Sequence, residues 1–274
     1  MKLVMTLLVR DTQDILRENI LYHLNQGVDF FIATDHRSTD SSKDILKEFE
    51  SQGLLHLIEE KGESYEQATW VTRMARLAKS KYKADWVINN DDDEFWWPID
   101  NTLNVTLQNL PPEDAVVSAP RHNFVPRLDM SSSPFEQMTV RHVLSKNSLG
   151  DPLPSKVCHR GLANVEVLAG SHSVKGRTTL KMFLGQPIAI FHFPIRSYQQ
   201  LENKVIEAGT GIRDLDPHLY PTWRKLYSAW KIGALPDYFR AECLSEEQIS
   251  AGIADGSLVV DERLRDFMRG RNII

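Results

Sequence analysis

Residues 86–98 read WVINNDDDEFWWP, and this stretch decides which architecture the chain can adopt. Its first five residues are mostly apolar, which is typical of a short buried strand. Four acids follow without a break at residues 91–94. In an open α/β sheet, ligands bind beyond the carboxyl ends of the strands, which is where this run of acids lies. The stretch therefore predicts a ligand site at the end of a buried strand.

The chemistry of the four acids points to a cation. Neighbouring carboxylates repel one another and resist removal from water, and a cation placed among them relieves both costs. Hard carboxylate oxygens suit Mg²⁺ or Mn²⁺, which keep open positions for substrate phosphates. The competing interpretation is a solvated acidic turn. The apolar strand before the acids and the aromatic residues 95–97 after them favour the metal site.

Length and composition restrict the class of protein. The chain has 274 residues, 42% of them hydrophobic and 25% charged, with a net charge of −5. These values fit a soluble globular protein of one large domain, with or without an appendage, and argue against a general nucleic-acid binder. Cys158 and Cys243 match no zinc or redox spacing and are expected to be reduced thiols in the cytosol.

The amino terminus is expected to be a strand. Residues 1–9 are apolar enough to suggest a signal peptide, but Arg10 and Asp11 interrupt the run and no cleavage site follows. No stretch approaches the roughly 20 apolar residues that a membrane span requires. We therefore expect residues 3–9 to form the first buried strand.

The first part of the chain alternates between strand and helix patterns. Strands are predicted at residues 3–9, 28–34, 54–58 and 86–90. The helices between them are predicted to start at Asp11 or Thr12, at one of residues 40–42, and at a capping box formed by Ser64 and Gln67. This order predicts an α/β fold with a mostly parallel, Rossmann-like sheet.

The second part of the chain is less regular. Further strands are predicted at residues 115–119, 138–144 and 187–193, and helices at residues 197–208, 221–231 and 245–254. The carboxyl-terminal segment is basic, with arginines at 263, 265, 269 and 271. A solvated helix face is the favoured interpretation of this segment, and a peripheral contact with anionic lipid is the alternative.

Taken together, these segments resemble the glycosyltransferase family 2 superfamily in its GT-A fold, and most closely the bacterial branch whose acidic motif runs D-x-D-E-F. The segments that carry the resemblance are Val9-Arg10-Asp11, residues 22–28, 35–40, 86–97 and 170–172, and residues 192–197. Each motif alone is moderate support, whereas their order and spacing make the set strong.

The resemblance implies a domain organisation. A GT-A domain would occupy residues 1–205, with a nucleotide-binding half at about 1–110 and an acceptor-binding, metal-completing half at about 111–205. Residues 206–274 would form a helical extension.

The resemblance also implies an activity. A metal-dependent enzyme would move a sugar from a nucleotide-sugar donor, with UDP favoured, to a hydroxyl of a glycan or lipid-linked acceptor. The enzyme would take part in surface polysaccharide synthesis, in the cytoplasm or at the inner face of the membrane. Asp91 and Asp93 would hold Mn²⁺ (or Mg²⁺), which neutralises the departing diphosphate. Asp92 would point elsewhere, to ribose or solvent. His192 would complete the metal site and favour Mn²⁺, unless it is an ordinary core histidine.

Donor-binding residues follow from the same resemblance. They are Asp11, Asp35, Arg73, Asp91, Arg196 and Lys204. Asp35 would accept a hydrogen bond from the base. Arg196 and Lys204 would bind the diphosphate, unless they are exposed helix charges. Arg10 is the alternative to Asp11, and Arg76 is the alternative to Arg73.

The general base is left open between two residues. His172 lies in a polar loop and titrates near neutral pH, so it could take the proton of the acceptor hydroxyl. Glu94 is the rival, and a retaining enzyme would need neither. Trp70, Trp96 and Trp97 would stack on sugar rings or belong to the core.

Two other classes of protein compete with this interpretation. A nucleotidyltransferase has a similar fold and acidic site, but the turn at residues 9–12 lacks the glycine-rich phosphate loop of those enzymes. A non-catalytic glycan-binding module is the second rival, and the presence of Asp91, Asp93 and His192 argues against it.

Overall fold

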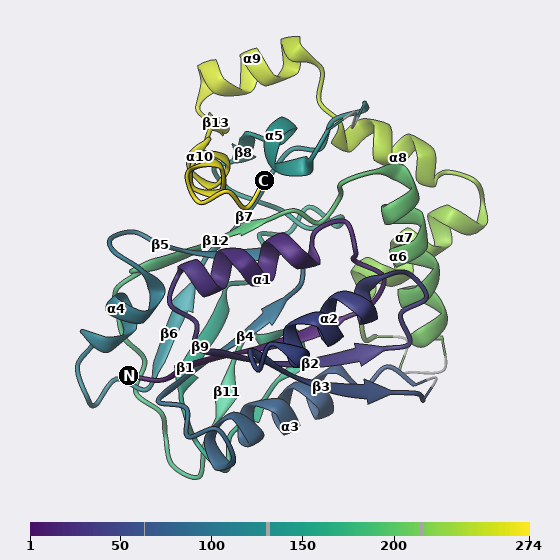
Figure 1. The fold of residues 1–274 in the computed structure, drawn as a ribbon. Coiled ribbons are helices and arrows are strands. Elements are labelled where there is room, and N and C mark those ends of the chain that lie inside the picture. Colours follow the sequence, from purple (N-terminus) through teal and green to yellow (C-terminus); the bar gives the residue numbers. More distant parts are fainter. Residues whose placement is uncertain (63, 130–131, 214–215, 217) are drawn as a thin grey trace. The chain divides into compact units, whose positions relative to one another are not determined.

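The computed structural model describes residues 1–62, 64–129, 132–213, 216 and 218–274 (Figure 1). The chain divides into two compact units. The first comprises residues 1–62, 66–121 and 154–190, and the second comprises residues 63–65, 122–153 and 191–274. This division does not follow the predicted boundary at residue 205, because residues 122–153 join the carboxyl-terminal segment rather than the sheet.

A six-stranded sheet forms the centre of the first unit, with the strand order β3-β2-β1-β4-β9-β6. Its strands are β1 (Leu3–Val9), β2 (Phe30–His36), β3 (Leu55–Glu60), β4 (Trp86–Asp91), β6 (Val116–Ala119) and β9 (Lys156–Arg160). Strands β1 to β4 pair in parallel, whereas β9 is antiparallel to both β4 and β6. The predicted α/β class and mostly parallel sheet are therefore confirmed.

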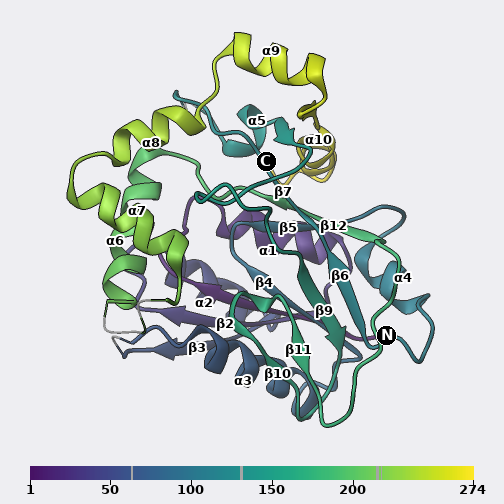
Figure 2. The same ribbon diagram turned by 180° about the vertical axis from the view of Figure 1, so that it is seen from behind.

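Helices cover both faces of this sheet (Figures 1 and 2). The helices of the first unit are α1 (Leu16–Asn25), α2 (Ser42–Ser51), α3 (Gln67–Ser80) and α4 (Leu103–Gln108). Alternate residues of β1 enter different clusters: Met5 packs with α1 and α2, and Val4 packs with α3. Because both faces are covered, β1 is apolar along almost its whole length.

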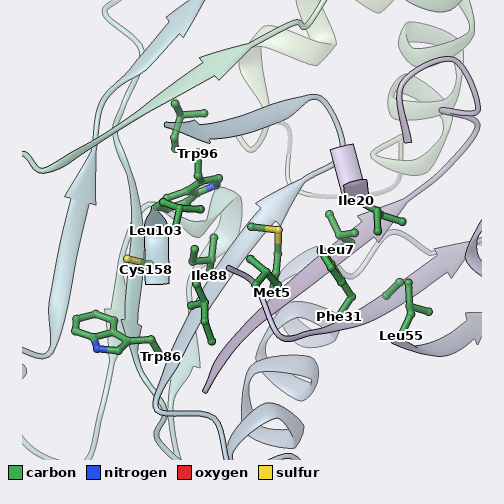
Figure 3. Packing of buried hydrophobic residues seen from close by; sticks show 14 of the residues in the cluster. Met5, Leu7, Ile20, Phe31, Leu55, Trp86, Ile88, Trp96, Leu103 and Cys158 are labelled. Carbon is green, nitrogen blue, oxygen red and sulfur yellow. The ribbon is translucent and has the colours of Figure 1, made fainter. Parts of the chain in front are cut away.

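The larger core cluster extends from β3 across the sheet to β9 (Figure 3). Trp86 and Trp96 are fully buried in it. Trp96 is therefore a core residue and not a platform for a sugar ring. Cys158 also lies in this cluster, and Cys158 and Cys243 are both buried free thiols.

Short elements complete the first unit. They are β5 (Glu94–Pro98), β10 (Glu166–Val167), the 3₁₀ turn η1 (Ala169–Ser171) and β11 (Val174–Lys175). A three-stranded sheet orders β5, β12 (Ile188–His192) and β7 (Arg121–Asn123). The division between the two units falls within β7 and within β12.

The second unit is mainly helical. Its elements are α5 (Pro134–Gln137), β8 (Val140–His142), α6 (Tyr198–Gly211), α7 (Pro221–Lys231), α8 (Leu235–Glu242), α9 (Glu246–Asp255), β13 (Leu258–Val260) and α10 (Arg263–Gly270). Leu201 of α6, Leu226 of α7 and Phe239 of α8 pack together in one hydrophobic core. Strand β13 pairs antiparallel with β8. No helix in the described part of the chain is long and apolar enough to cross a membrane.

Several local predictions were wrong. Helix α3 starts at Gln67 without a side-chain cap, so Ser64 and Gln67 form no capping box. Helix α1 starts at Leu16, beyond the predicted caps Asp11 and Thr12. Strand β8 is confined to Val140–His142, and helix α8 was not predicted. These errors are local, and the order of strands and helices from β1 to β4 is as expected.

Candidate active site

The carboxyl ends of β2, β1 and β4 meet at one edge of the sheet. In the register of the sheet, Val9 lies beside Asp35 and Leu8 lies beside Asp91. The predicted base-binding residue Asp35 and the acid turn after β4 are therefore brought to the two sides of the same strand. Asp35 is only 2% exposed, and its Oδ1 has no hydrogen-bond partner among the described residues. A buried carboxylate oxygen without a donor is costly, and a ligand's N–H would satisfy it.

Arg10 and His36 lie beside Asp35 at this edge. Burial lowers the pKa of His36, so the ring is neutral at pH 7. Its Nε2–H donates to the carbonyl of Gly62 at 3.0 Å, and its Nδ1 lies 3.5 Å from Arg10 Nη1. The His36 ring packs against Trp70 with 4.7 Å between centroids. Trp70 therefore helps to position this edge from α3.

Asp11 holds the loop that follows β2. Its Oδ1 accepts from the backbone N–H groups of Thr39 at 2.6 Å and Asp40 at 3.2 Å. Asp40 in turn accepts from the N–H of Ser42, the first residue of α2. The N-cap residue of α2 is Ser41, whose side chain makes no cap hydrogen bond, so the alternative that placed the cap at Asp40 is wrong. The structure thus gives Asp11 a loop-forming role, and donor binding by Asp11 stays a prediction.

The acid turn is fixed by buried contacts with α1. Asp92 Oδ2 accepts from the Thr12 hydroxyl at 2.9 Å, and Asp92 is buried. The predicted alternative in which Asp92 faces solvent is therefore wrong. The Asn19 amide donates to the carbonyl of Asp92 at 3.0 Å and to that of Glu94 at 2.9 Å. Asn19 is therefore the side chain that holds the backbone of the turn.

His23 and Tyr22 hold the strand that leaves the turn. Burial lowers the pKa of His23 to about 3, so its ring is neutral. His23 Nδ1–H donates to the Asn19 carbonyl at 2.8 Å, and its Nε2 accepts from the N–H of Trp96 at 3.2 Å. The Tyr22 hydroxyl donates to the carbonyl of Trp96 at 3.0 Å. These contacts explain the Tyr22-His23 motif structurally.

Lys156, the first residue of β9, was not predicted to be a site residue. Its Nζ lies 2.5 Å from Asp91 Oδ2 and 2.8 Å from Glu94 Oε2, and the side chain is 1% exposed. Burial alone would lower the pKa of Lys156, but the carboxylates of Asp91 and Glu94 outweigh it and raise the pKa. Lys156 is therefore a buried ammonium ion that bridges two of the four acids.

Glu94 is enclosed by positive charge. It is 0% exposed, and Arg121 Nη1 lies 3.4 Å from its Oε1, opposite Lys156. Arg121 is itself held by the carbonyl of Pro154, which accepts from Nε at 3.0 Å. An acceptor hydroxyl has no access to a fully buried carboxylate, so this arrangement favours His172 over Glu94 as general base.

His172 is oriented by the segment that carries Lys156. Its Nδ1–H donates to the carbonyl of Ser155 at 2.9 Å, which leaves the lone pair on Nε2. Burial lowers the pKa of His172, so the ring is a neutral base at pH 7. Gly170 has a φ of +70°, and a Cβ there would lie 2.5 Å from His172 Nε2. Position 170 of the loop therefore requires glycine. The loop is also held by Gln67, whose Oε1 accepts from the Gly170 N–H at 3.1 Å.

The acids suit a divalent ion chemically, although the described residues include no group of three or more histidines, cysteines or carboxylates placed to hold one. The Asp91 side chain is 35% exposed, and a cation, the ammonium of Lys156, already lies against it. Hard oxygen donors that attract a cation fit Mg²⁺ or Mn²⁺. Asp93, which is buried, is the second predicted ligand.

Three predicted residues belong to the second unit. His192 Nδ1–H donates to Asn123 Oδ1 at 2.7 Å, so Nε2 carries the lone pair that a metal would need. Arg196 is 2% exposed and precedes α6, so it is not the exposed helix charge of the alternative interpretation. Lys204 lies 5.9 Å from the ring centroid of Trp223. Their roles toward the donor and the metal stay predictions.

Arg73 lies in a groove along α3. Its Nη2 pairs with Glu60, the last residue of β3, at 2.6 Å. Its alternative, Arg76, donates from Nε to the carbonyl of Val165 at 2.7 Å, which is a structural contact. Arg73 is therefore the better placed of the two, and donor binding by Arg73 stays a prediction.

Comparison with solved structures finds, among others, three proteins that were solved with nucleotides or nucleotide sugars. Residues 1–349 of TarS of S. aureus, solved in complex with UDP, are 11% identical, with a TM-score of 0.41, and the match covers 79% of this chain and 67% of that fragment. Glucosyl-3-phosphoglycerate synthase of Mycobacterium tuberculosis, solved with Mn²⁺, UDP and glucosyl-3-phosphoglycerate, is 16% identical, with a TM-score of 0.31 and 44% of each chain covered. The mannosyltransferase PcManGT of Pyrobaculum calidifontis, solved with GDP-Man and Mn²⁺, is 15% identical, with a TM-score of 0.40, and the match covers 92% of this chain and 75% of PcManGT.

Comparison with sequences gives the family. No curated protein sequence matches the chain. The profile of glycosyltransferase family 92 matches residues 5–147, more than half of the 274 residues, and this segment includes the edge with Asp35 and the acid turn. The predicted enzyme class is thus confirmed, but the family is not the one that the resemblance named. The chain belongs to glycosyltransferase family 92.

Proposed function

We propose that the first unit binds a nucleotide-sugar donor at the carboxyl ends of β2, β1 and β4, and that the enzyme transfers the sugar to a hydroxyl of a glycan or lipid-linked acceptor. One observation carries the proposal: the register of three adjacent parallel strands brings buried Asp35 and the acid turn to one edge. That edge is where open α/β sheets bind ligands. The setting that we propose is surface polysaccharide synthesis on the cytoplasmic side of the membrane.

Asp35 is proposed to bind the base of the donor. Its Oδ1 is buried and has no partner among the described residues, so it needs a hydrogen-bond donor. The imide N–H of uracil supplies one, which favours a UDP-sugar. The neutral ring of His36 and the backbone turn held by Asp11 would define the walls of the base pocket.

Asp91 and Asp93 are proposed to hold Mn²⁺ or Mg²⁺, and the role of His192 toward this ion stays the prediction that the resemblance implies. The ion supplies positive charge that neutralises the diphosphate as it departs. Arg73, Arg196 and Lys204 are the further cations that we propose for diphosphate binding. Asp92 takes no part, because its carboxylate is held by Thr12.

His172 is proposed to be the general base. The Ser155 carbonyl fixes the proton on Nδ1, so Nε2 is the atom that would accept the proton of the acceptor hydroxyl. The lowered pKa keeps the ring neutral at pH 7. This role applies to an inverting transfer, in which the acceptor hydroxyl attacks directly and gives up its proton during the attack.

Donor hydrolysis tests the proposal without a known acceptor. The purified chain would be incubated with UDP-glucose, UDP-N-acetylglucosamine and GDP-mannose, with Mn²⁺ or with EDTA, and release of nucleoside diphosphate would be measured. We expect release from a UDP-sugar only with the ion, and a loss of about 100-fold or more in Asp93→Asn, because transition-state charge is left uncompensated. Asp44→Asn on the exposed face of α2 is the matched control and should keep full activity. Equal release by Asp93→Asn, or full release in EDTA, contradicts the proposal.

A further inference from the structure

The ammonium of Lys156 has a charge that the proposed reaction does not use. It is almost fully buried and lies 2.5 Å from Asp91 Oδ2 and 2.8 Å from Glu94 Oε2. Lysine is rarely buried to this extent unless it is paired, because removing an ammonium ion from water is costly. Both of its partners are carboxylates, so the pairing offsets that cost.

Two cations already lie against the two acids that Lys156 bridges. Asp91 and Glu94 contribute two negative charges, and Lys156 and Arg121 contribute two positive charges. The repulsion between adjacent acids, which would otherwise drive a metal ion into the turn, is therefore already relieved at Asp91. The run of acids predicted that a metal would relieve this repulsion, whereas in the structure the ammonium of Lys156 from β9 relieves it at Asp91.

We infer that Lys156 is a resident counter-cation that competes with the divalent ion for Asp91. The inference rests on the proposed metal site. An ion that binds Asp91 would lie close to an ammonium group, and like charges at such a distance repel strongly in a partly buried site. The ion alone should therefore bind weakly. An ion that arrives with the donor's diphosphate brings compensating negative charge, so donor and metal should bind together.

The geometry indicates how the exchange would proceed. Glu94 is the second partner of Lys156 and is fully buried, whereas the Asp91 side chain is 35% exposed. When the ion occupies Asp91, the ammonium can keep Glu94 and so stay paired. Lys156 is thus a positioning residue that controls when the metal site forms.

The test measures metal binding with no nucleotide present. Lys156→Gln and Lys156→Met remove the charge, and Gln keeps a hydrogen-bond donor for both acids. Lys181→Met is the matched control, because Lys181 also bridges two carboxylates, those of Glu113 and Asp114, outside the site. Mn²⁺ affinity of the full chain would be measured by electron paramagnetic resonance, and folding by circular dichroism and melting temperature.

We expect both Lys156 variants to bind Mn²⁺ alone about tenfold or more tightly than the wild type, because a unit positive charge has been removed from beside the ion. Lys181→Met should bind as the wild type does. A folded Lys156 variant with unchanged Mn²⁺ affinity would overturn the inference. The titration contains no nucleotide, so UDP binding tests the proposed function independently.

A measurement on the wild type covers the case in which neither variant folds. The protein would be labelled uniformly with ¹⁵N and titrated with Mg²⁺. The Nζ resonance of Lys156 should move together with the backbone amides of Asp91 and Asp93. Amides that shift while the Lys156 resonance stays fixed would overturn the inference.

Discussion

Asn19 is predicted to be the most important support of the acid turn. It is 0% exposed, and its amide donates to the carbonyls of Asp92 and Glu94 at 3.0 and 2.9 Å. The perturbation is Asn19→Ala, which removes both donors and leaves the carboxylates of the turn unchanged. The variant therefore tests how much Asn19 stabilises the turn without changing the carboxylates that would carry the chemistry.

The expected loss in the free energy of unfolding depends on which hydrogen-bond donors each carbonyl keeps in the variant. Glu94 keeps a second donor, the amide of Asn90 at 3.1 Å, so its loss is partial and is about 1 kcal/mol. The Asp92 carbonyl loses the Asn19 donor in a buried site, which costs about 1–3 kcal/mol. We therefore expect Asn19→Ala to lower the free energy of unfolding by about 2–4 kcal/mol.

Urea unfolding of the purified protein measures this loss. Asn25→Ala is the matched control, because Asn25 lies on the same helix, is exposed and donates locally to the carbonyl of Leu21. The control should change the free energy of unfolding by no more than about 0.5 kcal/mol. A loss below about 1 kcal/mol in Asn19→Ala, or one equal to that of Asn25→Ala, would refute the reasoning.

Two further predictions concern histidines. His23 has a pKa of about 3 in the folded protein against 6.5 in the unfolded chain, so its stabilising contribution is present above pH 6.5 and is lost as the pH falls toward 3. The stability advantage of the wild type over His23→Gln should shrink by about 2 kcal/mol between pH 7 and pH 5 in urea unfolding, and a constant difference would count against the neutral ring. The pKa of His172 is lowered by burial, so the acid limb of the pH profile of kcat should lie below pH 6.5. His172→Gln should lower kcat by about 100-fold with little change in donor KM or melting temperature, and unchanged kcat would exclude His172 as the base.

The part of the first unit from β1 to β4 was predictable because its signals are local. Continuous apolar runs indicated strands covered on both faces, and the parallel order followed from the helices between them. The predicted ends of the strands were less accurate than their order. Strand β2 continues to His36, because Asp35 and His36 still pair with Glu59 and Glu60 of β3. That pairing depends on a neighbouring strand and leaves no mark in the sequence of β2 itself.

The second unit was less predictable because its contacts are distant in sequence. Val140 of β8 pairs with Val260 of β13, and Arg141 binds Asp261 at 2.6 Å. Neither pairing has a local signal, so residues 122–153 could not be assigned to the carboxyl-terminal segment. The predicted boundary at residue 205 reflects only how far along the chain the resemblance extends.

The site was predicted in part. Strand-end position pointed to Asp35 and Asp91, which the structure brings to one edge. The capping motif at Gln67 was misleading, because the Gln67 side chain binds Gly170 instead. Lys156 starts the short strand KVCHR, and a lysine there has the same local pattern as an exposed edge residue. Only the antiparallel pairing of β9 with β4 places it against the acids.

The central claim is that a nucleotide binds at the edge that Asp35 and the acid turn share. Isothermal titration of UDP with Mg²⁺ into the wild type and into Asp35→Ala tests it most directly, with GDP and CDP as competing ligands. The account predicts that UDP binds the wild type in preference to GDP and CDP. It also predicts that Asp35→Ala binds UDP about 10- to 100-fold more weakly at an unchanged melting temperature, because a hydrogen bond to a charged group is lost. Equal UDP affinity in the two proteins, or a clear preference for GDP, would contradict it.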